Sequence, residues 1–171
     1  MIFCALHTKH FDKVCVFRKK HNEKYLSLGL SEEVSTAQAK KDLQKEFEQG
    51  FQGWEYKFNT VASSRGDYPF ISVTSGLSTS EFGKMANFAL LKTRAGGQGK
   101  AGNKKPVLFP KIIFLYDEKL HGKGGELEDV FEAGIDCSSK TMYPDWLSLT
   151  GKGYVASMYK QYGKVISPMG K

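Results

Sequence analysis

The run Ser-Pro-Met-Gly at residues 167–170 has the composition of a ligand-binding loop. The β-branched pair at 165–166 precedes it and is typical of a buried strand. Pro168 removes a backbone donor, and Gly170 lets the main chain come close to a ligand. Met169 offers a polarizable thioether without a readily abstracted S–H, which could line a substrate pocket or fill a gap in a core. The residues alone leave both interpretations open.

A second polar cluster has the residue types that bind phosphate or ribose. Ser63, Ser64 and Arg65 offer two hydroxyls and a guanidinium fork. Gly66 and Asp67 follow just before an expected strand. Loops of serine, glycine and aspartate are also common as plain turns, so the motif by itself does not decide between the two.

A third cluster, Ser78, Thr79 and Ser80, opens an expected helix directly after a strand. Free backbone N–H groups and the positive end of the helix dipole could hold a triphosphate there. The alternative is that these residues are ordinary helix caps, with Ser78 and Glu81 forming a capping box. Without further information we favour the caps.

The cysteines and histidines give no metal or nucleophile motif. The spacing of Cys4, His7, His10 and Cys15 fits no common zinc module. Cys137 lies on the apolar side of an expected helix and is interpreted as a small core residue. His121 lies in a glycine-flanked loop, where we expect it to be exposed.

Helices and strands alternate in the pattern that must position these residues. Helical periodicity is expected at 32–58, from the Ser78 cap to Ala95, at 126–139 and at 153–162. Strands are expected at 70–74, at 107–115 with an interruption at Pro110, and at 165–166. The segment 98–105 is interpreted as a flexible, exposed connection, and residues 143–145 as a turn.

This alternation predicts an α/β fold with right-handed crossovers and a largely parallel sheet. A nearly continuous apolar run such as 107–115 is typical of a strand that is buried on both faces. Three strands are too few to close a barrel, and their outer edges would remain open for hydrogen bonding.

Several segments, in order and in spacing, resemble anaerobic (class III) ribonucleoside-triphosphate reductases. The match covers most of the chain from Lys40 to Gly170. The segments that carry it are Gln-Gly-Trp-Glu-Tyr-Lys-Phe-Asn-Thr at 52–60, Ser-Ser-Arg-Gly-Asp-Tyr-Pro-Phe at 63–70, Leu-Phe-Pro-Lys at 108–111, Phe-Leu-Tyr-Asp at 114–117, Thr-Met-Tyr-Pro-Asp at 141–145, and Ser-Pro-Met-Gly at 167–170.

The resemblance implies a fold and a division of the chain. The family fold is a ten-stranded α/β barrel of two antiparallel half-sheets, of which this chain would hold a minority of strands. Residues 1–25 match nothing and are unassigned, and residues 26–171 would be a fragment of the catalytic barrel domain. Met169 and Gly170 would then lie beside the radical site. Nucleotide-binding residues would be Ser63, Ser64, Arg65, Ser78 and Thr79.

The resemblance also implies the reaction and its partners. The family reduces ribonucleoside triphosphates to deoxyribonucleotides with a glycyl radical that an S-adenosylmethionine activase generates, with formate commonly the reductant. The parent enzyme would be a homodimer with ATP and deoxynucleotide effectors and a zinc site near its C-terminus, and this fragment would bind none of these cofactors itself. We expect its partners to be the substrate nucleotide, the activase and the remainder of the reductase.

The position of the radical cysteine departs from the family pattern. A cysteine follows Pro-Met-Gly in the family, whereas Lys171 stands at that position here. A lysine ammonium offers no comparably weak bond for reversible hydrogen transfer. We therefore expect the isolated chain to be inactive and the coding region to be interrupted or split at the cysteine codon.

Composition sets the remaining limits. A chain of 171 residues with 40% hydrophobic residues suits one domain with a real core. A mean hydropathy of −0.40 and the lack of an apolar run of about 20 residues argue against a membrane protein, and no signal peptide is evident. Three scattered cysteines fit a reducing compartment, so we expect a cytoplasmic location.

Two alternatives to a reductase fragment stay open. The net charge of +7 would also suit a small basic module that binds nucleotides or RNA. Against it, the aromatic residues lie mainly on apolar stripes and not among the lysines, so stacking platforms are not evident. The other alternative is a truncated product without function.

Overall fold

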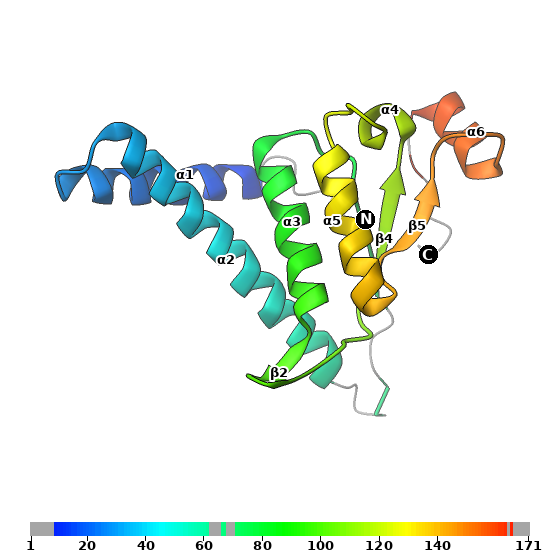
Figure 1. The fold of residues 1–171 in the computed structure, drawn as a ribbon, viewed down its shortest axis with the longest axis horizontal. Helices are drawn as coiled ribbons and strands as arrows, with labels where there is room; N and C mark the ends of the chain where they lie inside the picture. The colour runs from blue at the N-terminus through cyan, green and yellow to red at the C-terminus, as the bar shows by residue number, and fades with distance from the viewer. Residues whose placement is uncertain (1–8, 62–65, 68–70, 164, 166–171) are drawn as a thin grey trace.

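The computed structural model describes residues 9–61, 66–67, 71–163 and 165, and every structural statement below refers to these residues. Figure 1 shows how the elements are arranged. They follow one another as α1 (Lys9–Ser27), α2 (Glu32–Thr60), β1 (Ser72–Ser75), α3 (Glu81–Gly96), β2 (Gln98–Lys100), β3 (Asn103–Lys105), β4 (Lys111–Tyr116), α4 (Glu118–His121), α5 (Glu128–Thr141), β5 (Asp145–Ser148) and α6 (Tyr154–Tyr162). The predicted helices at 32–58 and 153–162 are confirmed.

The main sheet has the order β1-β4-β5, and both neighbouring pairs are parallel. Val73 pairs with Ile112, and Phe114 pairs with Trp146. Helix α3 connects β1 to β4, and α5 connects β4 to β5. The predicted α/β class with a parallel sheet is therefore confirmed. The described strands form no closed barrel, and the sheet by itself neither supports nor contradicts a partial barrel.

The third strand of the sheet is not the predicted one. The sequence predicts only a turn at 143–145, whereas β5 begins at Asp145. Most of β5 is solvent-exposed, so it lacks the continuous apolar run that marks a buried strand. Its large residue, Trp146, packs its ring against Phe114 and Phe131. Of the predicted strand at 165–166, Val165 is described without strand structure and Ile166 lies outside the described residues.

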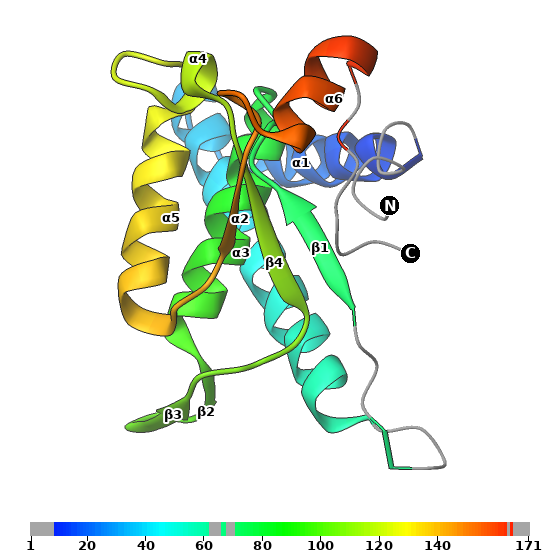
Figure 2. The same cartoon turned by 90° about the vertical axis from the view of Figure 1, so that its right-hand side faces the viewer.

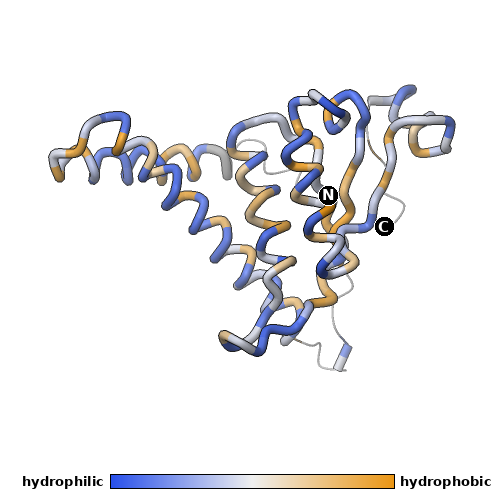
Figure 3. Tube along the Cα trace, in the orientation of Figure 1, coloured by the Kyte–Doolittle hydropathy of each residue, from blue (hydrophilic) through white to orange (hydrophobic). Residues whose placement is uncertain are grey.

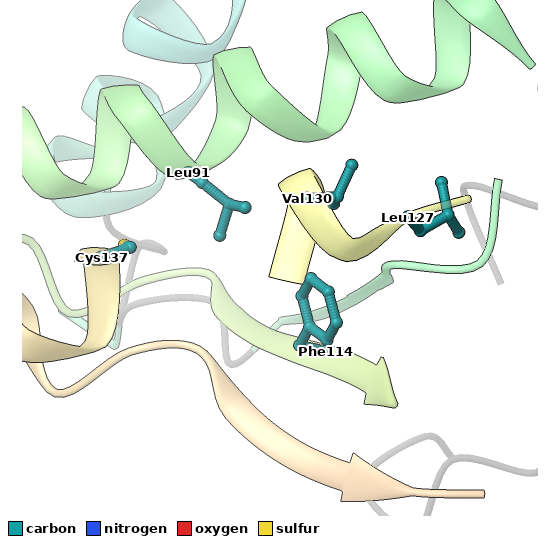
Figure 4. Packing of buried hydrophobic residues seen from close by; sticks show 5 residues of the cluster. All are labelled: Leu91, Phe114, Leu127, Val130 and Cys137. Carbon is teal, nitrogen blue, oxygen red and sulfur yellow. The ribbon is translucent and has the colours of Figure 1, made fainter. Parts of the chain in front are cut away.

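Side chains of β4 alternate between the two faces of the sheet, and each face has its own core. On the face toward α3 and α5, Phe114 is fully buried against Leu91, Leu127, Val130 and Cys137 (Figure 4). The predicted core role of Cys137 is thus confirmed, because its side chain is 1% exposed. Figure 3 shows β4 as a nearly continuous hydrophobic segment at the centre of the molecule.

The opposite face of β4 carries a second, smaller core. Ile113 and Leu115 pack there with Leu149. The partly buried hydrophobic residues against this core come from the β1–α3 loop, β5, α6 and the segment after α6: Leu77, Leu147, Val155, Tyr159 and Val165. The sheet is therefore covered by long helices on one face and by α6 on the other (Figure 2).

A helical hairpin of α1 and α2 projects from the body (Figure 1). Residues 1–25, unassigned from sequence, for the most part form α1. Asp42 of α2 fixes the hairpin, because its carboxylate accepts a hydrogen bond of 2.6 Å from the Tyr25 hydroxyl and lies 3.0 Å from His21 Nδ1. The Tyr25 hydroxyl, more than any other neighbour, lowers the pKa of Asp42.

The segment 98–105 is a β-hairpin, so its prediction as a flexible connection is wrong. Strands β2 and β3 pair antiparallel directly after α3. Two glycines make the tight approach of the strands possible. A Cβ at Gly97 would lie 2.6 Å from Lys105 O, and one at Gly99 would lie 2.7 Å from Asn103 O. Both residues also have positive φ angles, of 65° and 132°.

None of the helices in the described part of the chain combines the length and the apolar character that a membrane crossing requires.

Candidate functional site

The loops at the carboxyl ends of β1 and β4 form the best candidate site, because ligands of parallel α/β sheets bind at that edge. Residues 76–80, called the 76–80 loop below, connect β1 to α3. The side chains of Ser78 and Thr79 are exposed in this loop, as a phosphate-binding role requires. The structure thus brings together two of the predicted substrate-binding residues.

The cap of α3 differs from the predicted capping box. Ser80, not Ser78, is the N-cap, and its Oγ accepts a hydrogen bond of 3.1 Å from the backbone N–H of Gly83. Ser78 Oγ lies 3.1 Å from Ser80 Oγ. Position 83 requires a glycine, because a Cβ there would collide with the Ser78 side chain. Ser78 therefore lies directly over the first turn of the helix.

Ion pairs from three other helices fix the start of α3. The predicted capping carboxylate, Glu81, instead lies 2.6 Å from Lys40 Nζ and 3.4 Å from Arg18 Nη1. Lys84 Nζ donates to the carbonyl of Glu126 at 2.9 Å and lies 3.1 Å from the Asp129 carboxylate. Exposed ion pairs contribute little stability, up to about 1 kcal/mol each, but together they define where the helix begins.

The other end of the 76–80 loop is held by His121. This residue is 1% exposed, so the prediction of an exposed loop histidine is wrong. Its Nε2 lies 3.0 Å from the carbonyl oxygen of Gly76, and its Nδ1 lies 3.1 Å from the backbone nitrogen of Asp117. The ring thereby joins the end of β1 to the end of β4. A histidine at the start of a glycine-rich loop gave no signal in the sequence for such a contact.

A buried ion pair lies toward the amino ends of the strands and was not predicted. Glu55 of α2 and Arg94 of α3 are both fully buried, with Arg94 Nε 2.6 Å from Glu55 Oε1. Arg94 also donates to the carbonyl oxygen of Pro110 at 2.7 Å. Burial raises the pKa of the Glu55 carboxyl, and the Arg94 guanidinium opposes part of that rise.

Asn59 extends this buried network to the segment before β4. Its amide nitrogen donates to the Phe109 carbonyl at 2.6 Å, and its amide oxygen accepts from the backbone nitrogen of Phe109 at 3.2 Å. Glu55, Asn59 and Arg94 therefore position the chain that enters β4. Glu55 and Asn59 fall within the segment at 52–60 that carries the resemblance described above.

The described residues offer no thiol at the candidate site. Cys137 lies in the core between α3 and α5 (Figure 4), and burial raises the pKa of its thiol. A protonated, buried thiol is unreactive. Within the described part of the chain, no group of three or more metal-ligating side chains is close enough together to hold an ion. The described residues thus do not fit a radical cysteine site or a zinc site.

The remaining predicted site residues lie outside the described residues. They are Ser63, Ser64 and Arg65 of the first polar cluster, and Met169, Gly170 and Lys171 at the end of the chain. Cys4 and His7 of the discounted zinc set also lie outside.

The parallel sheet and the helices packed on it define an α/β protein. Comparison with known proteins makes the assignment specific. The family model described as anaerobic ribonucleoside-triphosphate reductase matches residues 14–170. The chain belongs to this family.

Individual relatives agree with the family match. The anaerobic ribonucleoside-triphosphate reductase of Haemophilus influenzae is 36% identical over 133 residues, which cover 77% of this chain and 18% of that protein. The reductase of Escherichia coli is 35% identical over 127 residues, or 74% of this chain and 17% of that protein. The enzyme of Enterobacteria phage T4 is 31% identical over 152 residues, or 88% of this chain and 24% of that protein. The chain therefore spans less than a quarter of the length of these relatives.

Proposed function

We propose that the chain forms part of the catalytic domain of an anaerobic ribonucleoside-triphosphate reductase and contributes to its nucleotide site. The observation that carries this proposal is the 76–80 loop, where exposed Ser78 and Thr79 follow β1 at the carboxyl edge of a parallel sheet. Hydroxyls and free backbone N–H groups at a helix start suit the triphosphate of a nucleotide. Family membership adds weight to this assignment.

The same proposal extends to the architecture. Among the described residues, β1 and β5 each have a strand on one side only, so the sheet has two open edges. Open edges of a parallel sheet are the places where further strands add. We propose that residues 26–171 are a piece of the ten-stranded α/β barrel and that the remaining strands complete it at these edges.

Residues outside the described part complete the proposed site. Ser63, Ser64 and Arg65 would join Ser78 and Thr79 in binding the nucleotide. Met169 and Gly170 would line the pocket beside the position of the radical cysteine. Because Lys171 stands at that position, this chain by itself would reduce no ribonucleotide.

The partners and cofactors follow from the proposed reaction. They are the ribonucleoside triphosphate, an S-adenosylmethionine activase that makes the glycyl radical, formate as reductant, and the remainder of a homodimeric reductase with its effector nucleotides. A cytoplasmic location suits this set and the free thiols Cys15 and Cys137.

Nucleotide binding provides the test. We expect the chain to bind ribonucleoside triphosphates. The single changes Ser78→Ala and Thr79→Ala should each weaken binding about tenfold, because each hydroxyl that bonds a charged phosphate contributes roughly 1–2 kcal/mol. Isothermal titration with ATP, CTP and inorganic triphosphate measures the affinity.

The matched control removes a hydroxyl that lies elsewhere. Ser157 on α6 is exposed and bonds its own helix, so Ser157→Ala should leave the affinity unchanged. Absence of triphosphate binding by the unmutated chain, or equal loss in both variants, would contradict the proposed site.

One observation favours a second candidate function, the binding of single-stranded RNA by a basic surface. Lys100, Lys104 and Lys105 are exposed on the β2–β3 hairpin, which contains no acidic residue. A cationic hairpin attracts a phosphate backbone without sequence preference. This function would be independent of the 76–80 loop.

Salt dependence separates this candidate from ordinary surface charge. If the hairpin binds RNA, the variant K100Q/K104Q/K105Q should lower the slope of log affinity against log salt by about 2, since each neutralised phosphate of a single strand contributes roughly 0.7. The control K13Q/K19Q/K20Q removes the same charge from α1. Equal slopes for the two variants, measured with an oligouridine by fluorescence anisotropy, would show only general electrostatic attraction.

A further inference from the structure

We propose that His121 is a positioning residue that holds the 76–80 loop in its phosphate-binding conformation, an inference that rests on the proposed function of that loop. His121 belongs to α4, which follows β4, whereas the loop follows β1. The two elements are neighbours because β1 and β4 pair in parallel. The histidine is thus placed to fix one loop of the sheet edge against the next.

The geometry assigns a direction to each hydrogen bond of the ring. The Gly76 carbonyl is an acceptor, so Nε2, at 3.0 Å, carries the proton and donates. Nδ1 is then free to accept from the backbone N–H of Asp117 at 3.1 Å. Nδ1 is also 3.1 Å from the Asp117 carbonyl oxygen, but that oxygen already accepts from two backbone N–H groups, those of His121 at 2.8 Å and Leu120 at 3.0 Å.

Aromatic side chains hold the plane of the ring. Tyr116 stacks on it at a centroid distance of 5.6 Å and an interplanar angle of 27°, and Phe114 meets it edge-on at 5.1 Å. With 1% exposure, the ring cannot turn to bond water instead. Its two hydrogen bonds therefore have fixed directions.

The ring bonds to Gly76, the first residue after β1, and the backbone has little freedom there. Gly76 has a φ of 116°, and a Cβ there would lie 2.8 Å from the Leu115 carbonyl oxygen. The chain leaves β1 at this residue and reaches Ser78 two residues later. Ser80 caps α3 at the far end, so the loop is held at both ends, and the side chains of Ser78 and Thr79 between them are exposed.

Burial of a polar imidazole ring is less favourable than burial of an apolar side chain of the same size. An apolar side chain of similar size would pack among the same aromatic rings, whereas a buried imidazole is unfavourable unless its nitrogens are hydrogen-bonded. What the imidazole adds is direction, since a hydrogen bond fixes the Gly76 carbonyl where apolar contact would leave it free to turn. That is the property expected of a residue that sets the shape of a binding loop.

Two substitutions in the full 171-residue chain separate position from packing. His121→Leu removes both hydrogen bonds, whereas His121→Gln keeps one donor and one acceptor at similar places. We expect His121→Leu to speed hydrogen exchange of the Asp117 amide at least tenfold, to speed exchange in the 76–80 loop, and to weaken inorganic triphosphate binding about tenfold. His121→Gln should restore most of both. His21→Leu, on α1, is the matched control and should change neither.

The outcomes distinguish this inference from the proposed function. Unchanged exchange at Asp117 and in the loop of His121→Leu would overturn it, whatever the nucleotide affinity. Faster exchange with unaltered triphosphate affinity would overturn the role in binding. If the unmutated chain binds no triphosphate, the proposed function fails and so does the binding role, while the exchange data still decide whether His121 holds the loop.

A measurement on the unmutated chain covers the case in which His121→Leu does not fold. Two-bond proton–nitrogen correlation spectra report which ring nitrogen carries the proton. Protonated Nε2 with unprotonated Nδ1 is the expected result. The opposite tautomer would leave the Gly76 carbonyl without a donor from the ring and would overturn the proposal.

Discussion

The Arg94→Met variant should lose about 3–5 kcal/mol of unfolding free energy at neutral pH, because it leaves the Glu55 carboxylate buried without its cation. The loss of unfolding free energy should exceed the net contribution of the Arg94–Glu55 ion pair itself. The guanidinium also bonds the Pro110 carbonyl at 2.7 Å, and that acceptor would lose its partner. Urea unfolding followed by circular dichroism measures the change.

The pH dependence of this loss has a definite sign. Burial already raises the pKa of Glu55 in the folded chain, and removal of Arg94 removes what opposes the rise. A carboxyl whose folded pKa is raised stabilises the native state below its unfolded pKa and loses that contribution as the pH rises through its folded pKa. The Arg94→Met penalty should therefore be larger at about pH 8 than at about pH 5.

Two comparisons identify the buried charge as the cause. The double variant Glu55→Leu with Arg94→Met should be less destabilised than Arg94→Met alone, because no unpaired charge remains inside. Lys140→Met breaks the exposed pair with Asp136, whose side chains are 54% and 61% exposed, and should cost no more than about 0.5 kcal/mol. A double variant that is less stable than Arg94→Met would contradict this explanation.

Phe114→Ala should cost about 3–5 kcal/mol, the second large effect. Phe114 is fully buried in the middle strand and lies in the core that α3 and α5 form against the sheet (Figure 4). Its ring also meets Trp146 of β5 at 4.8 Å and His121 at 5.1 Å. The cavity would therefore loosen the packing of β5 and of α4 at once.

Thermal and urea unfolding of Phe114→Ala and Phe114→Leu test this prediction. Leucine fills much of the space, so its cost should be about 1–1.5 kcal/mol. An alanine variant as stable as the leucine variant would contradict the prediction, because it would mean that the surrounding side chains relax and fill the cavity.

The sequence predicted those parts of the fold that have a strong local signal. The helix from Glu32 has an acidic first turn and apolar residues at helical spacing, and the apolar run that contains β4 is unbroken from Ile112 to Tyr116. Alternation of such elements leads to parallel pairing, and the structure has it in both pairs. Propensity and periodicity were sufficient because they agree with the tertiary environment.

Elements whose stability comes from distant contacts were missed. Strand β5 is short and mostly exposed, and its pairing depends on β4 and on the packing of Trp146. The β2–β3 hairpin depends on glycines that let its strands come close together. In the sequence, the same glycines are also typical of a flexible linker. Local composition carries no information on such partners.

The candidate site was predictable only in part. Ser78 and Thr79 follow a strand and precede a helix, and this local order can be predicted from the sequence. His121, Glu55 and Arg94 act through partners 39 to 45 residues away in the chain, such as Arg94 for Glu55 and Gly76 for His121. Contacts of that range have no signature in a single sequence, whereas the resemblance to the reductase family came from the motifs directly.

The order β1-β4-β5 also decides where a ligand could lie. Successive strands are added on the same side of the previous one, and the two connecting helices, α3 and α5, share one face, where both contact Phe114. A doubly wound sheet has a topological switch point, where the strand order reverses and a crevice opens for the ligand. The described sheet never reverses, so it offers no such crevice. If the proposed function holds, a ligand of the 76–80 loop would therefore lie over the carboxyl ends of β1 and β4 and not in a crevice of the described sheet.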